Sequence, residues 1–163
     1  RNINRTFFLH SRAITKMMQF NQDTAINYLQ QILEFELAGV VRYTTYSLMV
    51  NNSEKNEIVS FLREQAEESL FHSQKVGEVL VSINGNPQPR ITPIAELESY
   101  SVKDILNASL AHEKQALGLY EKLLDSLKGS NSDIEEFISN MIEEEGHHTQ
   151  ELAEMIDDLS SEQ

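Results

Sequence analysis

Glutamate and histidine residues recur in this chain at spacings that suit a site for two metal ions. In each half, a glutamate within an apolar stretch is followed 32 residues later by a second glutamate (68 − 36 and 145 − 113). A histidine comes four residues after the second glutamate in the first half and three residues after it in the second. The repeated residues are Glu36, Glu68 and His72, and then Glu113, Glu145 and His148. Four carboxylates with two imidazoles suit iron or manganese better than structural zinc, which favours thiolates.

Glu36 and Glu113 are expected to be buried, which is costly for a carboxylate. Each lies on a helical stripe of largely apolar residues at steps of three and four. No lysine or arginine on these stripes could compensate an ionised carboxylate, whereas a bound pair of cations could. Tyr43 and Tyr120 lie seven residues beyond these glutamates (43 − 36 and 120 − 113). We expect their hydroxyls to hydrogen-bond the glutamates across the bundle and to fix their rotamers.

The stretch "EEEGHHTQEL" leaves two registers open. Glu144 with His147 has the same spacing as Glu145 with His148. The apolar stripe favours the second pair, because it continues to Leu152 in the same register. The first pair would turn the site about 100° away from that stripe.

Four long stretches show the apolar period of an α-helix and must position these side chains. They cover about residues 23–50, 54–82, 101–127 and 132–159. Ser101 with Asp104 and Ser132 with Glu135 have the spacing of capping boxes, and Gly85 is placed to end the second helix.

The connection lengths predict the topology. Short connections within each pair of helices make the first and second, and the third and fourth, antiparallel neighbours. The middle connection, about residues 85–100, contains all three prolines and is long enough to cross a bundle whose helices span about 42 Å. We therefore predict an all-α four-helix bundle made of two antiparallel hairpins joined by a long crossover loop.

Composition sets the limits on other functions. A chain of 163 residues suits one domain, and the absence of cysteine excludes disulfides, thiolate metal sites and cysteine nucleophiles. A net charge of −13 argues against nucleic-acid binding, and no apolar run is long enough for a membrane span. His112 is off its helical stripe and is expected to be solvated.

The first residues differ in charge from the rest. Residues 1–19 carry four basic residues and no acid, so we separate a basic N-terminal extension, residues 1–21, from a bundle domain, residues 22–163. His10 belongs to this extension. The segment is interpreted as appended ahead of a start near Met17 or Met18, with a targeting segment as the alternative.

The four helical stretches together resemble the ferritin-like di-iron carboxylate superfamily, and within it a bacterioferritin-type protein. The resemblance covers about residues 22–160 and rests on "FELAGVVRY", "AEESLFHSQKVGEVL", "LAHEKQALGLY" and "MIEEEGHHTQEL". It implies Glu36 and Glu113 as terminal ligands, Glu68 and Glu145 as bridging ligands, and His72 and His148 with one metal each.

The same resemblance implies a function. Such a site would be a ferroxidase centre, in which ferrous iron is oxidised by dioxygen or peroxide. Its cofactor would be a pair of iron ions. The resemblance also implies a cytoplasmic homo-oligomer that stores iron, with a hollow shell of 24 subunits as the form to test.

The sequence departs from the family pattern at three places. Ser69 stands three residues before His72, where the family has a glutamate ligand, so this role must pass to Glu68 or be lost. Leu70 occupies the position of the haem-binding methionine, which argues against haem. Only 15 residues follow His148 (163 − 148), which leaves little room for a fifth helix.

Two other functions remain as alternatives. One is a non-storing di-iron oxidase or peroxide reductase of rubrerythrin type, which nearby carboxylates such as Glu64 and Glu67 would favour and the absence of cysteine disfavours. The other is a metal-free helical interaction protein whose site has decayed around Ser69.

Overall fold

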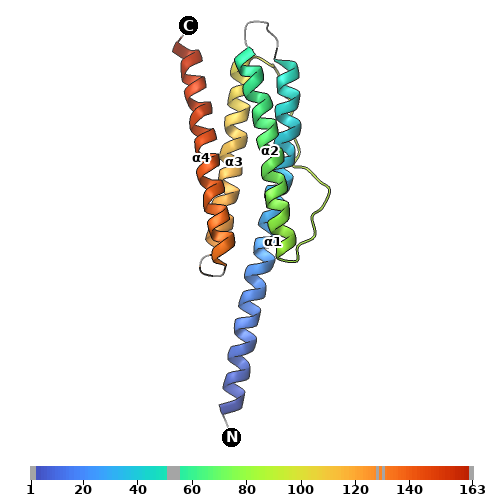
Figure 1. The fold of residues 1–163 in the computed structure, drawn as a ribbon, viewed down its shortest axis with the longest axis vertical. Helices are drawn as coiled ribbons and strands as arrows, with labels where there is room; N and C mark the ends of the chain where they lie inside the picture. Colours follow the sequence, from blue (N-terminus) through green and yellow to red (C-terminus); the bar gives the residue numbers. More distant parts are fainter. Residues whose placement is uncertain (1–2, 51–55, 128, 130, 162–163) are drawn as a thin grey trace.

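The computed structural model describes the backbone of residues 3–50, 56–127, 129 and 131–161, and side chains from Gln22 onward within these ranges except that of Asn56. The described part is all-α, with four long helices and no strand (Figure 1). They are α1 (Ile3–Met49), α2 (Asn56–Ser82), α3 (Val102–Leu127) and α4 (Ser132–Ser161). The predicted basic extension is therefore continuous with the first helix of the bundle from Ile3 onward.

The helices form two antiparallel hairpins, α1 with α2 and α3 with α4, and α1 also packs against α3. The crossover between α2 and α3 runs along the outside of the bundle (Figure 1). It is held to α1 at Glu34, whose carbonyl accepts from the Thr92 amide at 3.0 Å and whose carboxylate pairs with Arg90 at 2.8 Å. The all-α bundle with a long crossover is thus confirmed.

Local hydrogen bonds determine where α2 ends and where α3 begins. Asn84 takes the left-handed conformation after α2, with φ of 61°. The amide of Gly85 donates to the Leu80 carbonyl at 2.8 Å, and that of Asn84 donates to Val81 at 3.0 Å, as in a Schellman motif. Gly85 therefore takes part in the stop, but Asn84 holds the left-handed position. At α3, the Ser101 hydroxyl accepts from the Asp104 amide at 3.2 Å, as predicted.

The predicted capping box at the start of α4 is wrong by one residue. Asn131, rather than Ser132, caps this helix, because its side-chain oxygen accepts from the Ile134 amide at 3.1 Å. The Ser132 hydroxyl instead contacts the neighbouring Asp133 carboxylate at 3.3 Å. Asparagine and serine are about equally good caps, so "SNS" alone does not distinguish them.

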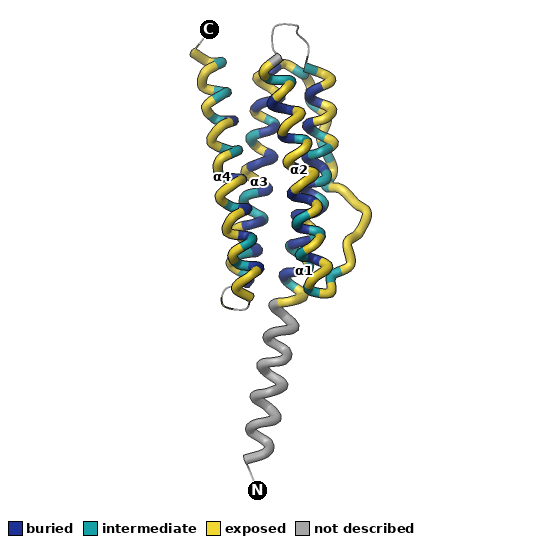
Figure 2. Tube along the Cα trace, viewed as in Figure 1, coloured by how far each residue is buried: buried dark blue, intermediate teal, exposed yellow. Residues whose placement is uncertain are grey.

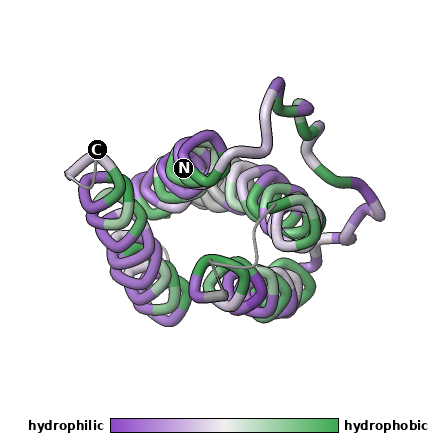
Figure 3. Tube along the Cα trace, turned by 90° about the horizontal axis from the view of Figure 1, so that it is seen from above, coloured by the Kyte–Doolittle hydropathy of each residue, from purple (hydrophilic) through white to green (hydrophobic). Residues whose placement is uncertain are grey.

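The buried residues form two apolar clusters, and they are separated along the bundle by a polar layer. On α1 one cluster uses Leu29 and Ile32, the other uses Tyr43 and Tyr46, and Glu36 lies between them. The buried positions face the bundle interior and polar residues cover its outside (Figures 2 and 3). The apolar clusters hold the helices together, so the polar layer at mid-height is a fixed position for side chains.

No helix in the described part of the chain is both long and apolar enough to cross a bilayer.

Candidate metal centre

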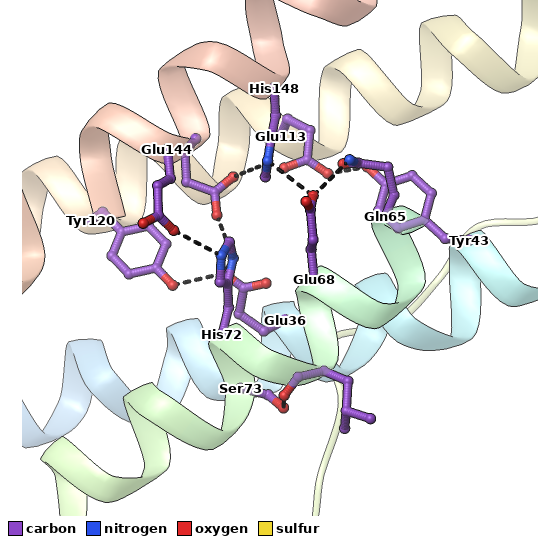
Figure 4. A network of polar contacts seen from close by, with 12 residues as sticks. Glu36, Tyr43, Gln65, Glu68, His72, Ser73, Glu113, Tyr120, Glu144 and His148 are labelled. Carbon is purple, nitrogen blue, oxygen red and sulfur yellow. Dashed lines mark hydrogen bonds and ion pairs between the residues drawn. The ribbon is translucent and has the colours of Figure 1, made fainter. Parts of the chain in front are cut away.

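All four helices contribute side chains to the polar layer, which is shown in Figure 4. Its innermost residues are Glu36 from α1, His72 from α2, Glu113 from α3, and Glu145 with His148 from α4. Glu145 is the most buried of them, with only 1% of its surface exposed. Glu144 and His147 are exposed, so α4 presents Glu145 and His148 to the interior, in the register that the apolar stripe favoured.

Glu145 lies between two groups of possible metal ligands. One group is Glu36, His72 and Glu145, and the other is Glu113, Glu145 and His148. Within each group, one donor atom from every residue lies within 4.8 Å of the others. Oε1 of Glu145 is 3.0 Å from Nδ1 of His72, and its Oε2 is 3.6 Å from Nδ1 of His148. One carboxylate thus faces two imidazoles, which is the geometry of a ligand that bridges two metal ions.

Two tyrosines fix the outer glutamates from across the bundle. The hydroxyl of Tyr120 on α3 donates to Glu36 on α1 at 2.7 Å. The hydroxyl of Tyr43 on α1 donates to Glu113 on α3. Both tyrosine rings are fully buried, and the hydrogen bonds expected from the sequence are present.

Glu68 and Glu144 form a second reciprocal pair, on the solvent side of the histidines. Glu68 lies 3.1 Å from Nε2 of His148, and Glu144 lies 3.2 Å from Nε2 of His72. Their side chains are 49% and 53% exposed. Neither carboxylate belongs to the two converging groups, so the structure places Glu68 behind His148 rather than beside Glu145.

Protons can compensate the charges of these buried groups when no metal ion is bound. Burial raises the pKa of Glu36, and burial raises that of Glu113 well above its usual value. Burial alone would lower the pKa of both histidines, but neighbouring carboxylates, above all Glu145, raise it to about 11 for His72 and about 10 for His148. Burial likewise opposes ionisation of Glu145, yet the imidazoles of His148 and His72 beside it hold its pKa well below the usual range.

One atom at the centre points to a cation. Oε2 of Glu145 is buried and has no hydrogen-bond partner. A buried, ionised oxygen without a donor is expensive, and a metal ion would satisfy it. The nitrogen and oxygen donors around it are those that iron and manganese accept. The residues present therefore fit a pair of such ions.

The prediction that His112 is solvated, made from its position off the stripe, is wrong. His112 is buried, with 4% of its surface exposed. Its ring stacks on Phe35 at 4.4 Å and meets the edge of the Tyr43 ring at 5.9 Å. Burial, with the charge of Arg42, lowers the pKa of His112 to about 3, so its imidazole is neutral. The α3 stripe did not reveal this, because a second face of α3 packs against Phe35, Gly39 and Tyr43 of α1.

Gly39 is a second position that sequence reasoning missed. A Cβ atom there would lie 2.7 Å from the Ser69 hydroxyl and 3.0 Å from Nε2 of His112. Glycine therefore lets α1 approach α2 and α3 closely beside the centre. Its place one turn after Glu36 was the only available signal.

The comparisons with known proteins agree with this geometry. Residues 26–161 match the family model of the ferritin-like domain. The chain belongs to the ferritin-like family. A search of curated protein sequences finds no match.

Several solved structures share the ferritin-like fold at low identity. A ferritin-like diiron-carboxylate protein of Bacillus anthracis str. Ames has a TM-score of 0.79 at 18% identity, over 83% of this chain and 97% of its own. Rhodobacter capsulatus bacterioferritin, solved with a metal-free dinuclear site and haem iron, has a TM-score of 0.76 at 21% identity. The match covers 85% of this chain and 87% of the bacterioferritin chain. A dodecameric thioferritin of Bacteroides fragilis, a bacterioferritin-related protein, has a TM-score of 0.81 at 18% identity. The match covers 92% of this chain and 95% of the thioferritin chain.

Proposed function

We propose that this ferritin-like protein is a ferroxidase of a bacterioferritin-like iron store. The observation that carries the proposal is the bridging position of Glu145, with one oxygen toward each histidine and no hydrogen bond to Oε2. Two ferrous ions would each lose one electron there, and dioxygen or peroxide would accept the two electrons.

The side chains of this chain have separate tasks at such a centre. Glu36 with Nδ1 of His72 would hold one iron, and Glu113 with Nδ1 of His148 would hold the other. Glu145 would bind both. Tyr120 and Tyr43 keep the carboxylates of Glu36 and Glu113 oriented by donating a hydrogen bond to each. The two apolar clusters exclude water above and below the centre.

Ser69 makes the donor set smaller than the family pattern that the sequence resembles. Three inner carboxylates would face two ferrous ions, so one bridging carboxylate is absent from the inner set. The ligand role predicted for Glu68 requires its side chain to leave Nε2 of His148 and turn inward. The observed contact favours an orienting role instead, in which Glu68 fixes the tautomer that leaves Nδ1 free for metal.

The assembly is part of the proposal. A store needs a hollow oligomer, and both a 24-subunit shell and a smaller cage like that of the dodecameric neighbour would serve. Leu70 at the position of the haem-binding methionine leads us to propose a centre without haem. A cytoplasmic location stays a prediction.

The test is anaerobic titration of the metal-free protein with ferrous iron, followed by exposure to air. We expect two ferrous ions per chain, and a ferric absorption band that grows faster than in buffer. The double variant E36Q/E113Q should lose both, whereas E64Q/E67Q, which removes two exposed acids of α2, should keep both. Retention of iron binding by E36Q/E113Q would refute a metal centre.

Size and oxidant distinguish storage from the alternative oxidase. Light scattering should give a large assembly that retains ferric mineral through gel filtration. A monomer or dimer that turns over faster with peroxide than with dioxygen, and retains no mineral, would favour the rubrerythrin-type function. A protein that binds no iron at all would support the helical interaction protein.

A further inference from the structure

A pocket of about 220 Å³ lies outside the metal centre, between α1, α3 and the crossover. Phe35, Ala38 and Arg42 of α1 and His112 of α3 line it, and crossover residues including Pro93 and Leu97 cover it. Its walls are mostly apolar. Of the described residues that line it, none is acidic.

Two buried polar atoms of this pocket's lining residues have no hydrogen-bond partner. They are Nε of Arg42 and Nδ1 of His112. The guanidinium of Arg42 makes one hydrogen bond, from Nη1 to the Tyr46 hydroxyl at 2.8 Å, and no ion pair within the described residues. Arg42 is half-buried, and its guanidinium also lies 5.8 Å from the centre of the Tyr46 ring. Its positive charge therefore has no anionic partner among the described residues.

We propose that this pocket binds a small organic carboxylate, with its carboxylate at the guanidinium of Arg42 and its apolar body against Phe35 and the crossover. An anion is favoured because the lining carries one cation and no acid. A carboxylate matches the planar guanidinium, whose Nη2 makes no hydrogen bond within the described residues and, unlike Nε, is not among the buried atoms. The apolar walls favour a ligand with a hydrocarbon part over a bare inorganic anion.

The volume limits the size of the ligand. A cavity of about 150 Å³ accommodates benzene, so about 220 Å³ has room for a benzene ring with one carboxylate. Benzoate is therefore the probe of choice. Benzamide is the matched neutral probe, because it has almost the same shape and no charge.

The test is calorimetric titration of the full-length, metal-free protein with benzoate and, separately, with benzamide. We expect saturable binding of one benzoate per chain, and binding of benzamide at least about tenfold weaker, since a charge-assisted hydrogen bond is lost. Equal binding of the two probes, or no saturable binding of benzoate, would overturn the proposal.

Three variants locate the site. R42M should weaken benzoate binding about tenfold or more, whereas R63M, which removes an exposed arginine on α2, should leave it unchanged. Because R42M also removes the hydrogen bond to Tyr46, A111F offers a second route. Ala111 is an exposed lining residue, so the added ring should fill the pocket, abolish binding and preserve the helical circular dichroism. Unchanged binding in a folded A111F protein would place benzoate elsewhere and refute the assignment.

Discussion

The carboxylate of Glu68 on α2 lies 3.1 Å from Nε2 of His148 on α4. The reciprocal contact joins Glu144 of α4 to Nε2 of His72 on α2 at 3.2 Å. Each acid stands four residues before the histidine of its own helix and contacts the histidine of the other. Nδ1 of both imidazoles is thereby directed at Glu145, at 3.0 Å for His72 and 3.6 Å for His148.

Removing either outer carboxylate should therefore weaken metal binding without removing a ligand. We expect E68Q and E144Q each to lower ferrous affinity about 10- to 100-fold, the effect of losing a partner that orients a metal-binding histidine. Anaerobic titration should still show two ions per chain. E67Q is the control, because it removes one exposed acid beside Glu68.

The stoichiometry separates this role from the ligand role predicted for Glu68. If the carboxylate of Glu68 turned inward and bound metal, E68Q would bind fewer ions or lose much more affinity than E144Q. Equal losses in the two variants are the expected result, because their contacts are reciprocal.

Replacement of Glu145 should have a larger effect than that of any other glutamate. It is the one carboxylate common to both ligand groups, so E145Q should abolish tight binding of both ions. E113Q should instead remove mainly the ion on its own side. Titration of the two variants with ferrous iron measures the difference, and a full site in E145Q would contradict the bridging role.

The sequence predicted the helices and the convergence of the inner carboxylates, because both depend on periodicity. Glu36, Glu113 and Glu145 are on the stripes that the apolar clusters bury, so their convergence follows from the pairing of two hairpins. The partner of Glu68 could not be predicted this way. Residues four apart on one helix share a face, which favoured Glu68 with His72, but a side-chain rotamer takes it across the bundle.

His112 shows a second limit of periodicity. The apolar stripe of α3 predicts which of its residues face the bundle axis, whereas His112 is on another face, which packs against Phe35 and Tyr43 of α1. The sequence pattern does not predict where the 19-residue crossover (83–101) packs on the bundle. Its contacts with Glu34 are individual hydrogen bonds, which leave no periodic pattern in the sequence.

The stability of the metal-free protein should depend on pH. The pKa values of His72 and His148 are raised from the ordinary 6.5 to about 11 and about 10. Each protonated histidine therefore stabilises the fold fully below pH 6.5, and this stabilisation is lost as the pH rises through the pKa of the folded state. The lowered pKa of Glu145 has the opposite sign, but its contribution is complete above pH 4.5. The melting temperature should therefore fall between pH 6.5 and 9.5.

Thermal unfolding of the chelated protein across this range provides the measurement. The double variant H72Q/H148Q is the comparison, and its melting temperature should change less, because the two imidazoles with raised pKa are gone and, among the described carboxyl groups, only Glu36 and Glu113 keep raised pKa values. H147Q removes an exposed histidine of α4 and should retain the wild-type fall. A wild-type profile as flat as that of H72Q/H148Q would show that protons do not stabilise the empty centre.

The tyrosines offer a test of how the terminal glutamates are held. Y120F removes the 2.7 Å hydrogen bond to Glu36 but keeps the ring in the apolar cluster. We expect a loss of about 1 kcal/mol in stability and slower ferrous oxidation, since Glu36 then has fewer constraints on its rotamer. Y46F is the control, because Tyr46 is equally buried and its hydroxyl contacts Arg42 rather than a glutamate. Equal oxidation rates in Y120F and the wild type would assign Tyr120 to packing alone.

Gly39 should tolerate substitution much less than other helical glycines. In G39A the new methyl group would meet Ser69 and His112 at 2.7 and 3.0 Å, so overpacking should cost about 1–3 kcal/mol. G118A places the same methyl group on α3 with nothing within 4 Å, and should be neutral or stabilising by up to about 1 kcal/mol. Urea unfolding measures both. Adding S69G to G39A should recover part of the loss, because it removes the closer contact. If G39A were as stable as G118A, the close approach of α1 to α2 and α3 would not be a requirement of the fold.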